Sequence, residues 1–408
     1  MNHVAKRAAG SAAVLARAVL LAAPAVLSGC ASLPPALGGP ARSARDAIEV
    51  SPRDGARDVR PDAQVEVRVR EGRGRLVSVR VARIEDARRQ EVPGRIARDG
   101  RSWRPTGERA ALGLAAAYRV DAVMVDAAGR HTARRTAFTT AAPAHRFTGR
   151  LTPENRSTVG TGAIVSVRFD RPVRDRAAVE RAIRVTTVPT VEVAGHWFGD
   201  ARLDLRPARY WAPGTRVAVA ADLRDVRGAP GVYGDENRTV VFTVGRSQTS
   251  RVDVAAHTME VRRDGQLVAT VPVTAGRRGA DTYAGTLVVS EMLDETRMDG
   301  GAAGLAGPRG VADVPHALRL TGSGLFLHGD YWSDKGVFGR TDVSRGSIGL
   351  SDVRGGGGNT PAGWFFGRSL VGDVIEVVNS RGRPVAPDDG LGGWNLSWPR
   401  WKAGSALR

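Results

Sequence analysis

The stretch LHGDYWSDKGVFGRTDVSRGSIGL, residues 327–350, holds a histidine and a short Ser-Arg-Gly-Ser tetrad at a fixed spacing. Fifteen residues separate His328 from Ser344, the first residue of the tetrad. The histidine ends an apolar run, and a lone histidine in such a run is usually a core residue. Imidazole also titrates near neutral pH, which suits proton transfer. The residues alone leave both a core position and an active-site position open for His328.

The segments around this stretch predict a mostly β domain. HTMEVRRDGQLVATVPVTAG, residues 257–276, alternates apolar and polar side chains on either side of Asp264-Gly265, a strong signal for a two-residue hairpin turn. Further strands are predicted in residues 285–293, 318–332 and 373–380. Residues 361–370 are the best candidate for a helix, because a proline stands at its first turn.

Two more units precede this domain. Residues 48–144 and 145–246 each hold short alternating strands separated by turn residues, the pattern of a β-sandwich. Each unit carries tryptophan and closes on Phe-Thr, so we interpret them as a weak repeat of two immunoglobulin-like domains. One short helix is expected at residues 175–183. The predicted fold class is therefore mostly β, with two immunoglobulin-like sandwiches followed by a β-rich third domain.

The first residues have the features of an export signal. Lys6 and Arg7 precede an apolar stretch that ends in LSGC, residues 27–30. This ending resembles a bacterial lipobox, in which the signal (1–29) is cut before a cysteine that is then lipidated, here Cys30. The alternative is an ordinary signal peptide with a chance cysteine. Both predict an exported chain, and the lipobox predicts a lipid anchor in the cell membrane, with residues 30–47 as a tether.

Cysteine usage and charge narrow the chemistry. Cys30 is the only cysteine, so the chain has no intramolecular disulfide and no other thiol for catalysis. The net charge is +18 over 408 residues and is carried almost entirely by arginine, concentrated before residue 150. Export argues against nucleic acid as a partner, which leaves anionic wall polymers or simply solvated strand faces as explanations.

Four segments of the third unit resemble the L,D-transpeptidase (YkuD-type) catalytic domain. They are GLFLHGDYW, SRGSIGL, WFFGRSLVGDVIEVVNS and the aromatic tail GGWNLSWPRWKAGSAL. The resemblance implies an L,D-transpeptidase-type domain over residues 247–408, with the aromatic tail as part of it. Two immunoglobulin-like domains on a lipoprotein tether are a usual layout of such wall enzymes.

The resemblance also implies a role for each matched residue. Members of this family cross-link peptidoglycan stem peptides through a cysteine in a Ser/Thr-His-Gly-Cys motif. By analogy His328 is the general base and the carbonyl of Gly329 orients it. The amides of Gly346 and Ser347 would form the oxyanion hole. The motif departs from the family at two positions, where Arg345 replaces the second histidine and Ser347 replaces the cysteine.

These departures put catalysis in doubt. A serine hydroxyl must lose its proton during attack, whereas a thiol ionises partly beforehand. Arginine is always protonated and is no base, but it can hold a carboxylate bidentately. We therefore predict a substrate-binding role for Arg345 and Ser344. Met298 is added to them because RMDGG, residues 297–301, stands where the family has a substrate lid.

Two functions follow. The preferred hypothesis is a peptidoglycan-directed pseudoenzyme of the cell envelope that binds wall peptides and is catalytically impaired or inactive. The alternative is an active peptidoglycan acyltransferase with a Ser347-His328 dyad. No cofactor or metal is expected, since the histidines lack zinc spacing and RGGGG, residues 354–358, lacks the Lys-Ser/Thr of a phosphate loop.

Overall fold

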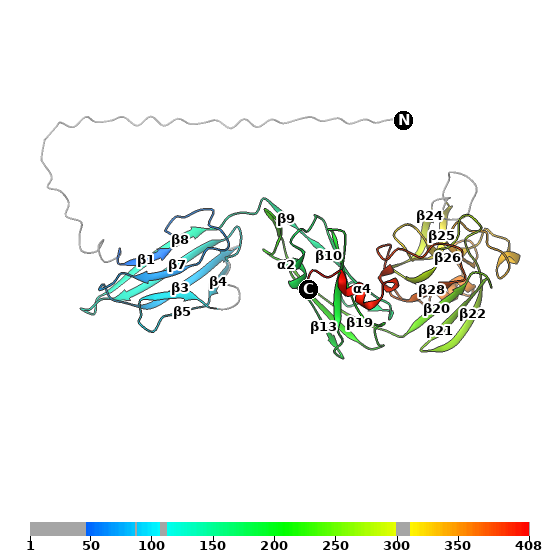
Figure 1. Ribbon diagram of the computed structural model, residues 1–408, viewed down its shortest axis with the longest axis horizontal. Helices are drawn as coiled ribbons and strands as arrows, with labels where there is room; N and C mark the ends of the chain where they lie inside the picture. Colours follow the sequence, from blue (N-terminus) through cyan, green and yellow to red (C-terminus); the bar gives the residue numbers. More distant parts are fainter. Residues whose placement is uncertain (1–45, 86–87, 107–111, 299–310, 408) are drawn as a thin grey trace, which may run out of the picture.

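The computed structural model of this chain describes residues 46–85, 88–106, 112–298 and 311–407. Three β domains follow one another in a row (Figure 1). The predicted mostly β fold class is confirmed. The export signal, Cys30 and most of the tether lie outside the described residues, as does the lid segment after Met298.

The first domain is a sandwich of two four-stranded sheets, in the orders β1-β2-β6-β5 and β4-β3-β7-β8. Alternation of buried and exposed residues, as along β7, turns one face of each sheet towards a shared core. Its strands are β1 (Ile48–Ser51), β2 (Glu66–Val69), β3 (Arg75–Glu85), β4 (Arg88–Val92), β5 (Gly94–Ile96), β6 (Ser102–Pro105), β7 (Ala117–Val125) and β8 (His131–Thr139).

The second domain repeats the sandwich, with sheets β10-β12-β15-β14 and β11-β19-β16-β13 and a small sheet β17-β18-β9 at its start. Its core holds Trp197 and Trp211 between the sheets. Its elements are β9 (His145–Phe147), β10 (Gly149–Thr152), β11 (Thr158–Val159), β12 (Val165–Phe169), α2 (Arg176–Arg181), β13 (Ile183–Val188), β14 (Val193–Phe198), β15 (Arg202–Pro207), β16 (Arg216–Asp222), β17 (Arg227–Ala229), β18 (Val232–Gly234) and β19 (Asn237–Val244).

The third domain is built on one nine-stranded sheet in the order β23-β28-β20-β21-β22-β27-β26-β25-β24. The β21-β22 hairpin turns at Asp264-Gly265, as predicted, and α3 packs over β25, β26 and β27. The elements are β20 (Gln248–Asp253), β21 (Thr258–Arg263), β22 (Gln266–Thr274), β23 (Gly285–Val288), β24 (Glu291–Met298), β25 (Val311–Arg319), β26 (Phe326–Asp330), η1 (Lys335–Val337), β27 (Ile348–Ser351), α3 (Pro361–Phe366), β28 (Val374–Val378), η2 (Gly392–Asn395) and α4 (Trp398–Ala403).

The aromatic tail corrects one expectation. The sequence grouped it with the third domain, but α4 packs on β14 of the second domain, and only η2 contacts the third domain, at β23. Figure 1 shows the carboxyl end of the chain lying against the second domain. Trp401 is fully buried there, stacked on His196 and on the guanidinium of Arg206. The tail therefore ties the second and third domains together.

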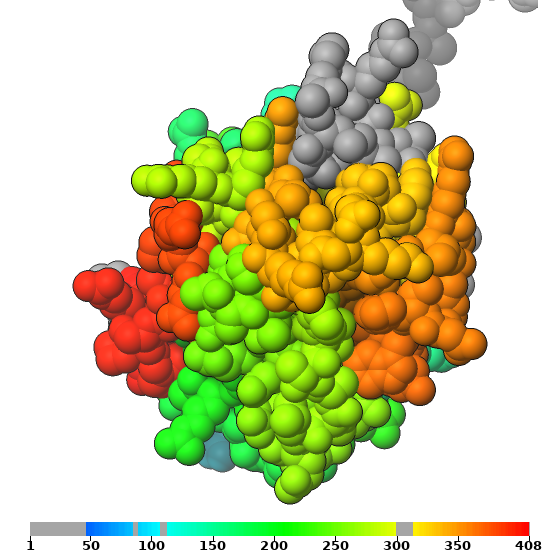
Figure 2. Space-filling model, turned by 90° about the vertical axis from the view of Figure 1, so that its right-hand side faces the viewer, coloured from blue at the N-terminus to red at the C-terminus, as the bar shows by residue number. Residues whose placement is uncertain are grey.

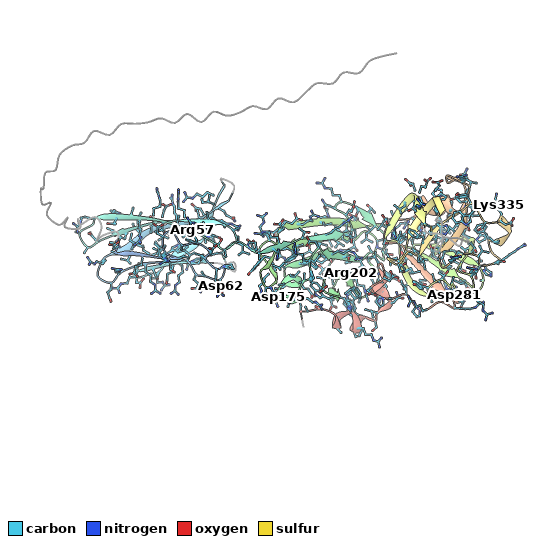
Figure 3. The ribbon with its side chains drawn as sticks, turned by 90° about the horizontal axis from the view of Figure 1, so that it is seen from above. Arg57, Asp62, Asp175, Arg202, Asp281 and Lys335 are labelled. Atoms are coloured by element: carbon cyan, nitrogen blue, oxygen red, sulfur yellow. The ribbon has the colours of Figure 1, made fainter. Side chains whose placement is uncertain are left out.

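A buried ion pair reinforces this contact. Arg202 forms a bidentate pair with Asp204 on β15, and its guanidinium also donates to the carbonyls of Asp388 and Gly390, just before the tail. Figure 3 shows Arg202 in the second domain beside the C-terminal segment. Because the charges are paired and the guanidinium is fully used, burial of this group is tolerated.

Candidate active site

Two neighbouring parallel strands bring His328 and Ser347 together. His328 lies on β26, opposite Gly349 of β27, and Ser347 immediately precedes β27. Both side chains are buried, each about 1% exposed. The spacing read from the sequence therefore corresponds to a loop that leaves β26 and returns to the strand beside it.

The histidine is held in one orientation. Its Nδ1 lies 3.1 Å from the carbonyl oxygen of Gly329, to which it donates, and its ring stacks on Trp332 at 5.4 Å between centroids. Burial lowers the pKa of His328 below its ordinary value, against the smaller opposing effects of the Gly329 carbonyl and the Asp330 charge. In its neutral form the imidazole carries its proton on Nδ1 and its lone pair on Nε2, which has no hydrogen-bond partner among the described residues.

Residue 329 must be glycine, because Asp352 leaves no room for a side chain at this position. A Cβ at this position would lie 2.1 Å from a carboxylate oxygen of Asp352. That carboxylate is fixed by His316 at 2.7 Å, by the hydroxyl of Thr360 at 2.8 Å and by two backbone amides. The sequence analysis did not find this His316-Asp352 pair, because nothing in their spacing separates them from other polar residues.

The hydroxyl oxygen of Ser347 has a backbone partner. Its Oγ accepts a hydrogen bond from the backbone N–H of Phe326, at 3.2 Å. The geometry thus brings the two predicted residues to adjacent strands without a hydrogen bond between Ser347 Oγ and His328 Nε2.

The remaining tetrad residues shape the loop. The hydroxyl of Ser344 donates to the carbonyl of Ser347 and accepts from the N–H of Gly346 at 3.3 Å. Gly346 has a φ of +117°, a conformation that favours glycine. Ser344 is buried, so its hydroxyl holds the loop together in this structure.

A cavity of about 530 Å³ opens beside Ser347. It is lined by Gly279, Ala280, Asp281, Tyr283, Ser323, Gly324, Leu325, Arg345, Gly346, Ser347, Arg381, Gly382 and Arg383. Figure 2 looks onto this domain, with the loop that follows β26 (orange) across its middle. Figure 3 marks Asp281 and Lys335 on the same domain.

The predicted substrate-binding residues do not all line this cavity. Arg345 lines it, but Met298 lies elsewhere, buried in a small apolar cluster with Val314, Ala317 and Phe326. His328 does not line it either. Arg381 and Arg383 reach the cavity from the loop after β28, and the sequence analysis missed them because no motif connects them with the tetrad.

Two general observations concern the described part of the chain only. Within it, three or more metal-ligating side chains are nowhere gathered as a metal site would require. None of its helices combines the length and the apolar character that crossing a bilayer requires.

The described site thus holds a buried histidine and a buried serine on or next to two paired strands of a β-rich domain, and the serine borders a polar cavity. Residues 247–377 match the L,D-transpeptidase catalytic domain family, and residues 56–227 match a bacterial Ig domain family. The chain belongs to the L,D-transpeptidase family.

Its relatives include mycobacterial proteins of similar length. L,D-transpeptidase 2 of Mycobacterium tuberculosis is 33% identical over 88% of this chain and 85% of its own length. L,D-transpeptidase 5 of the same species is 29% identical over 94% of this chain and 82% of its own. A solved L,D-transpeptidase in complex with imipenem is 31% identical, covering 56% of this chain and 97% of its own, with a TM-score of 0.46.

Proposed function

We propose that this protein binds peptidoglycan stem peptides in the cell envelope and that its family's cross-linking chemistry is lost or strongly impaired. One observation carries the second part. Among the described residues the Nε2 of His328 has no hydrogen-bond partner, so the Ser347 O–H does not donate to it and the hydrogen bond that activates a nucleophile is missing. Loss of a nucleophile or base in serine hydrolases lowers the rate by roughly 10⁴ to 10⁶.

Arg345 supports the same proposal. It occupies the tetrad position two residues before Ser347, where the family has a histidine, and a guanidinium does not accept a proton. In the proposal it contacts the bound peptide, while Ser344 and Gly346 keep the loop in shape.

The alternative is an active Ser347-His328 acyltransferase, and a different observation favours it. Because Nδ1 of His328 donates to Gly329, the free Nε2 is the basic nitrogen, as a general base needs. The alternative requires that the Ser347 O–H donate to this nitrogen, a bond that the described structure does not contain.

Cross-link formation on a tetrapeptide-containing muropeptide tests these functions, together with the mass of the protein after carbapenem treatment. We expect inert wild type and partial recovery of cross-linking and adduct formation in Ser347→Cys, with a further gain in Ser347→Cys/Arg345→His. Cross-linking by wild type that disappears in Ser347→Ala would contradict the pseudoenzyme proposal. Inert but folded Cys variants would place the loss in the pocket as well as in the nucleophile.

The location in the envelope is part of the proposal. The signal with its LSGC ending supports a membrane lipoprotein anchored at Cys30, with the domains over residues 48–144, 145–246 and 247–408 facing the wall. Cys30→Ala should release the protein from the membrane fraction into the medium. Unchanged retention in membranes would rule out the lipid anchor.

A further inference from the structure

The cavity beside Ser347 has an unusual charge balance. Three arginines line it, Arg345, Arg381 and Arg383, but only one carboxylate, that of Asp281. The third domain as a whole has about as many acidic as basic side chains, so this concentration of arginine is local.

The three arginines differ in their surroundings, since Arg345 is partly buried whereas Arg381 and Arg383 are exposed. The Nε of Arg345 is buried without a hydrogen-bond partner, and no described carboxylate pairs with Arg345 or Arg381. The guanidinium of Arg383 donates to the hydroxyl of Tyr283 at 3.2 Å and lies over its ring. The nearby carboxylate of Asp389 accepts from the amide and hydroxyl of Ser323. The Tyr283 hydroxyl and, to a smaller extent, the charge of Asp389 raise the pKa of Arg383. The partly buried guanidinium without a described counter-charge is therefore that of Arg345. A guanidinium placed at a cavity without a counterion favours an anionic ligand.

The shape of the cavity indicates what kind of anion. Its volume of about 530 Å³ is that of a small-molecule pocket and suits a ligand of a few residues. Gly279, Gly324, Gly346 and Gly382 line its walls, so that a peptide backbone can approach closely. A planar carboxylate matches the two parallel N–H groups of a guanidinium.

We propose that Arg345, Arg381 and Arg383 bind the free C-terminal carboxylate of a short peptide in this cavity. The inference rests on the proposed function, that the third domain binds stem peptides. It adds that the protein distinguishes peptides with a free acid end from peptides whose end is blocked, because only the free acid supplies the missing counterion.

Calorimetric titration of the full-length chain in detergent tests this. The probes are a disaccharide-tetrapeptide and the same compound with a C-terminal carboxamide. We expect the acid to bind at least tenfold more tightly than the amide. Arg345→Gln should weaken binding of the acid about tenfold and leave the amide unchanged, and Arg345→Lys should lose less, since it keeps the charge without the fork.

Arg340→Gln is the matched control, because Arg340 is exposed on the same loop and does not line the cavity. It should bind both probes as wild type does, and thermal melting verifies that every variant is folded. Equal binding of acid and amide would overturn the carboxylate site while leaving the proposed function intact. Absence of binding by both probes would overturn the two together. Displacement of the acid by millimolar phosphate but not by acetate would overturn the inference in favour of a phosphate ligand.

Discussion

The two junctions between the three domains are built differently. The first and second domains meet through the side chain of Asp225, whose carboxylate accepts from the N–H of Leu114 at 3.2 Å and pairs with Arg146 at 3.2 Å and Arg83 at 3.7 Å. The second and third domains meet through backbone. The N–H of Gly160 donates to the carbonyl of Val371 at 2.7 Å.

The second junction depends on a close approach between the backbones of the second and third domains. A second backbone bond joins Gly162 to Gly372, and a Cβ on Gly160 would lie 2.4 Å from the backbone nitrogen of Asp373. Arg246 then forms a bidentate pair with the fully buried Asp373, at 2.8 and 2.9 Å. The tail adds Trp394, whose Nε1 donates to the carbonyl of Gly162. The comparison teaches that the second and third domains form one stability unit, whereas the first is attached by a polar contact that water can replace.

Removal of the tail's anchor should have the largest effect. Trp401→Ala leaves a cavity against His196 and Arg206, and we expect a loss of about 3–5 kcal/mol in the free energy of unfolding. The transition of the second and third domains should shift together in a urea titration, and that of the first should not. Arg400→Ala on the same helix, at an exposed position, is the control. A shift of the third domain alone would show that the tail does not couple it to the second.

The next effect concerns the ion pair at the second junction. Asp373→Ala leaves the Arg246 guanidinium without its partner, and we expect destabilisation by about 3 kcal/mol. Denaturant unfolding measures it, with the exposed pair Arg60-Asp62 as a reference for which Asp62→Ala should cost almost nothing. Equal losses in the free energy of unfolding for Asp373→Ala and Asp62→Ala would contradict the expected difference between buried and exposed ion pairs.

The pH dependence of this junction should be smaller but specific. Burial raises the pKa of Asp373 above its ordinary value of 3.8, in spite of the opposing effect of Arg246. The folded state therefore holds this proton more tightly than the unfolded state, and the contribution of Asp373 to stability falls as pH rises from about 4 through the raised pKa. Asp373→Asn should remove that slope in melts taken at a series of pH values. An unchanged slope would assign it to other groups.

The first junction should respond least in stability. Asp225→Asn weakens a partly exposed polar contact, and we expect a loss of about 1 kcal/mol or less. Small-angle X-ray scattering should instead show a broader distribution of distances across the molecule. A large loss of stability with unchanged scattering would mean that the two junctions are alike.

The sequence predicted what depends on local pattern. Alternation and turn residues indicated the sandwiches and the Asp264-Gly265 hairpin, and the proline at the first turn of α3 indicated a helix at that point. The tail's partner could not be predicted, because the contact of Arg206 with Trp401 joins positions far apart in the chain and neither residue has a spacing that points to the other.

The candidate site shows the same limit. His328 and Ser347 were found because they match the spacing of a family motif, and the structure places them on or next to two adjacent strands. The direction in which the Ser347 hydroxyl points, and the arrival of Arg381 at the cavity, depend on tertiary packing that no local signal records.

The tail also sets an order of events during synthesis. Since Trp401 covers a strand that the ribosome made about two hundred residues earlier, the second domain stays open on that side until the tail has been synthesised. A chain that is cut before the tail is therefore left with a defect in a domain remote from the break.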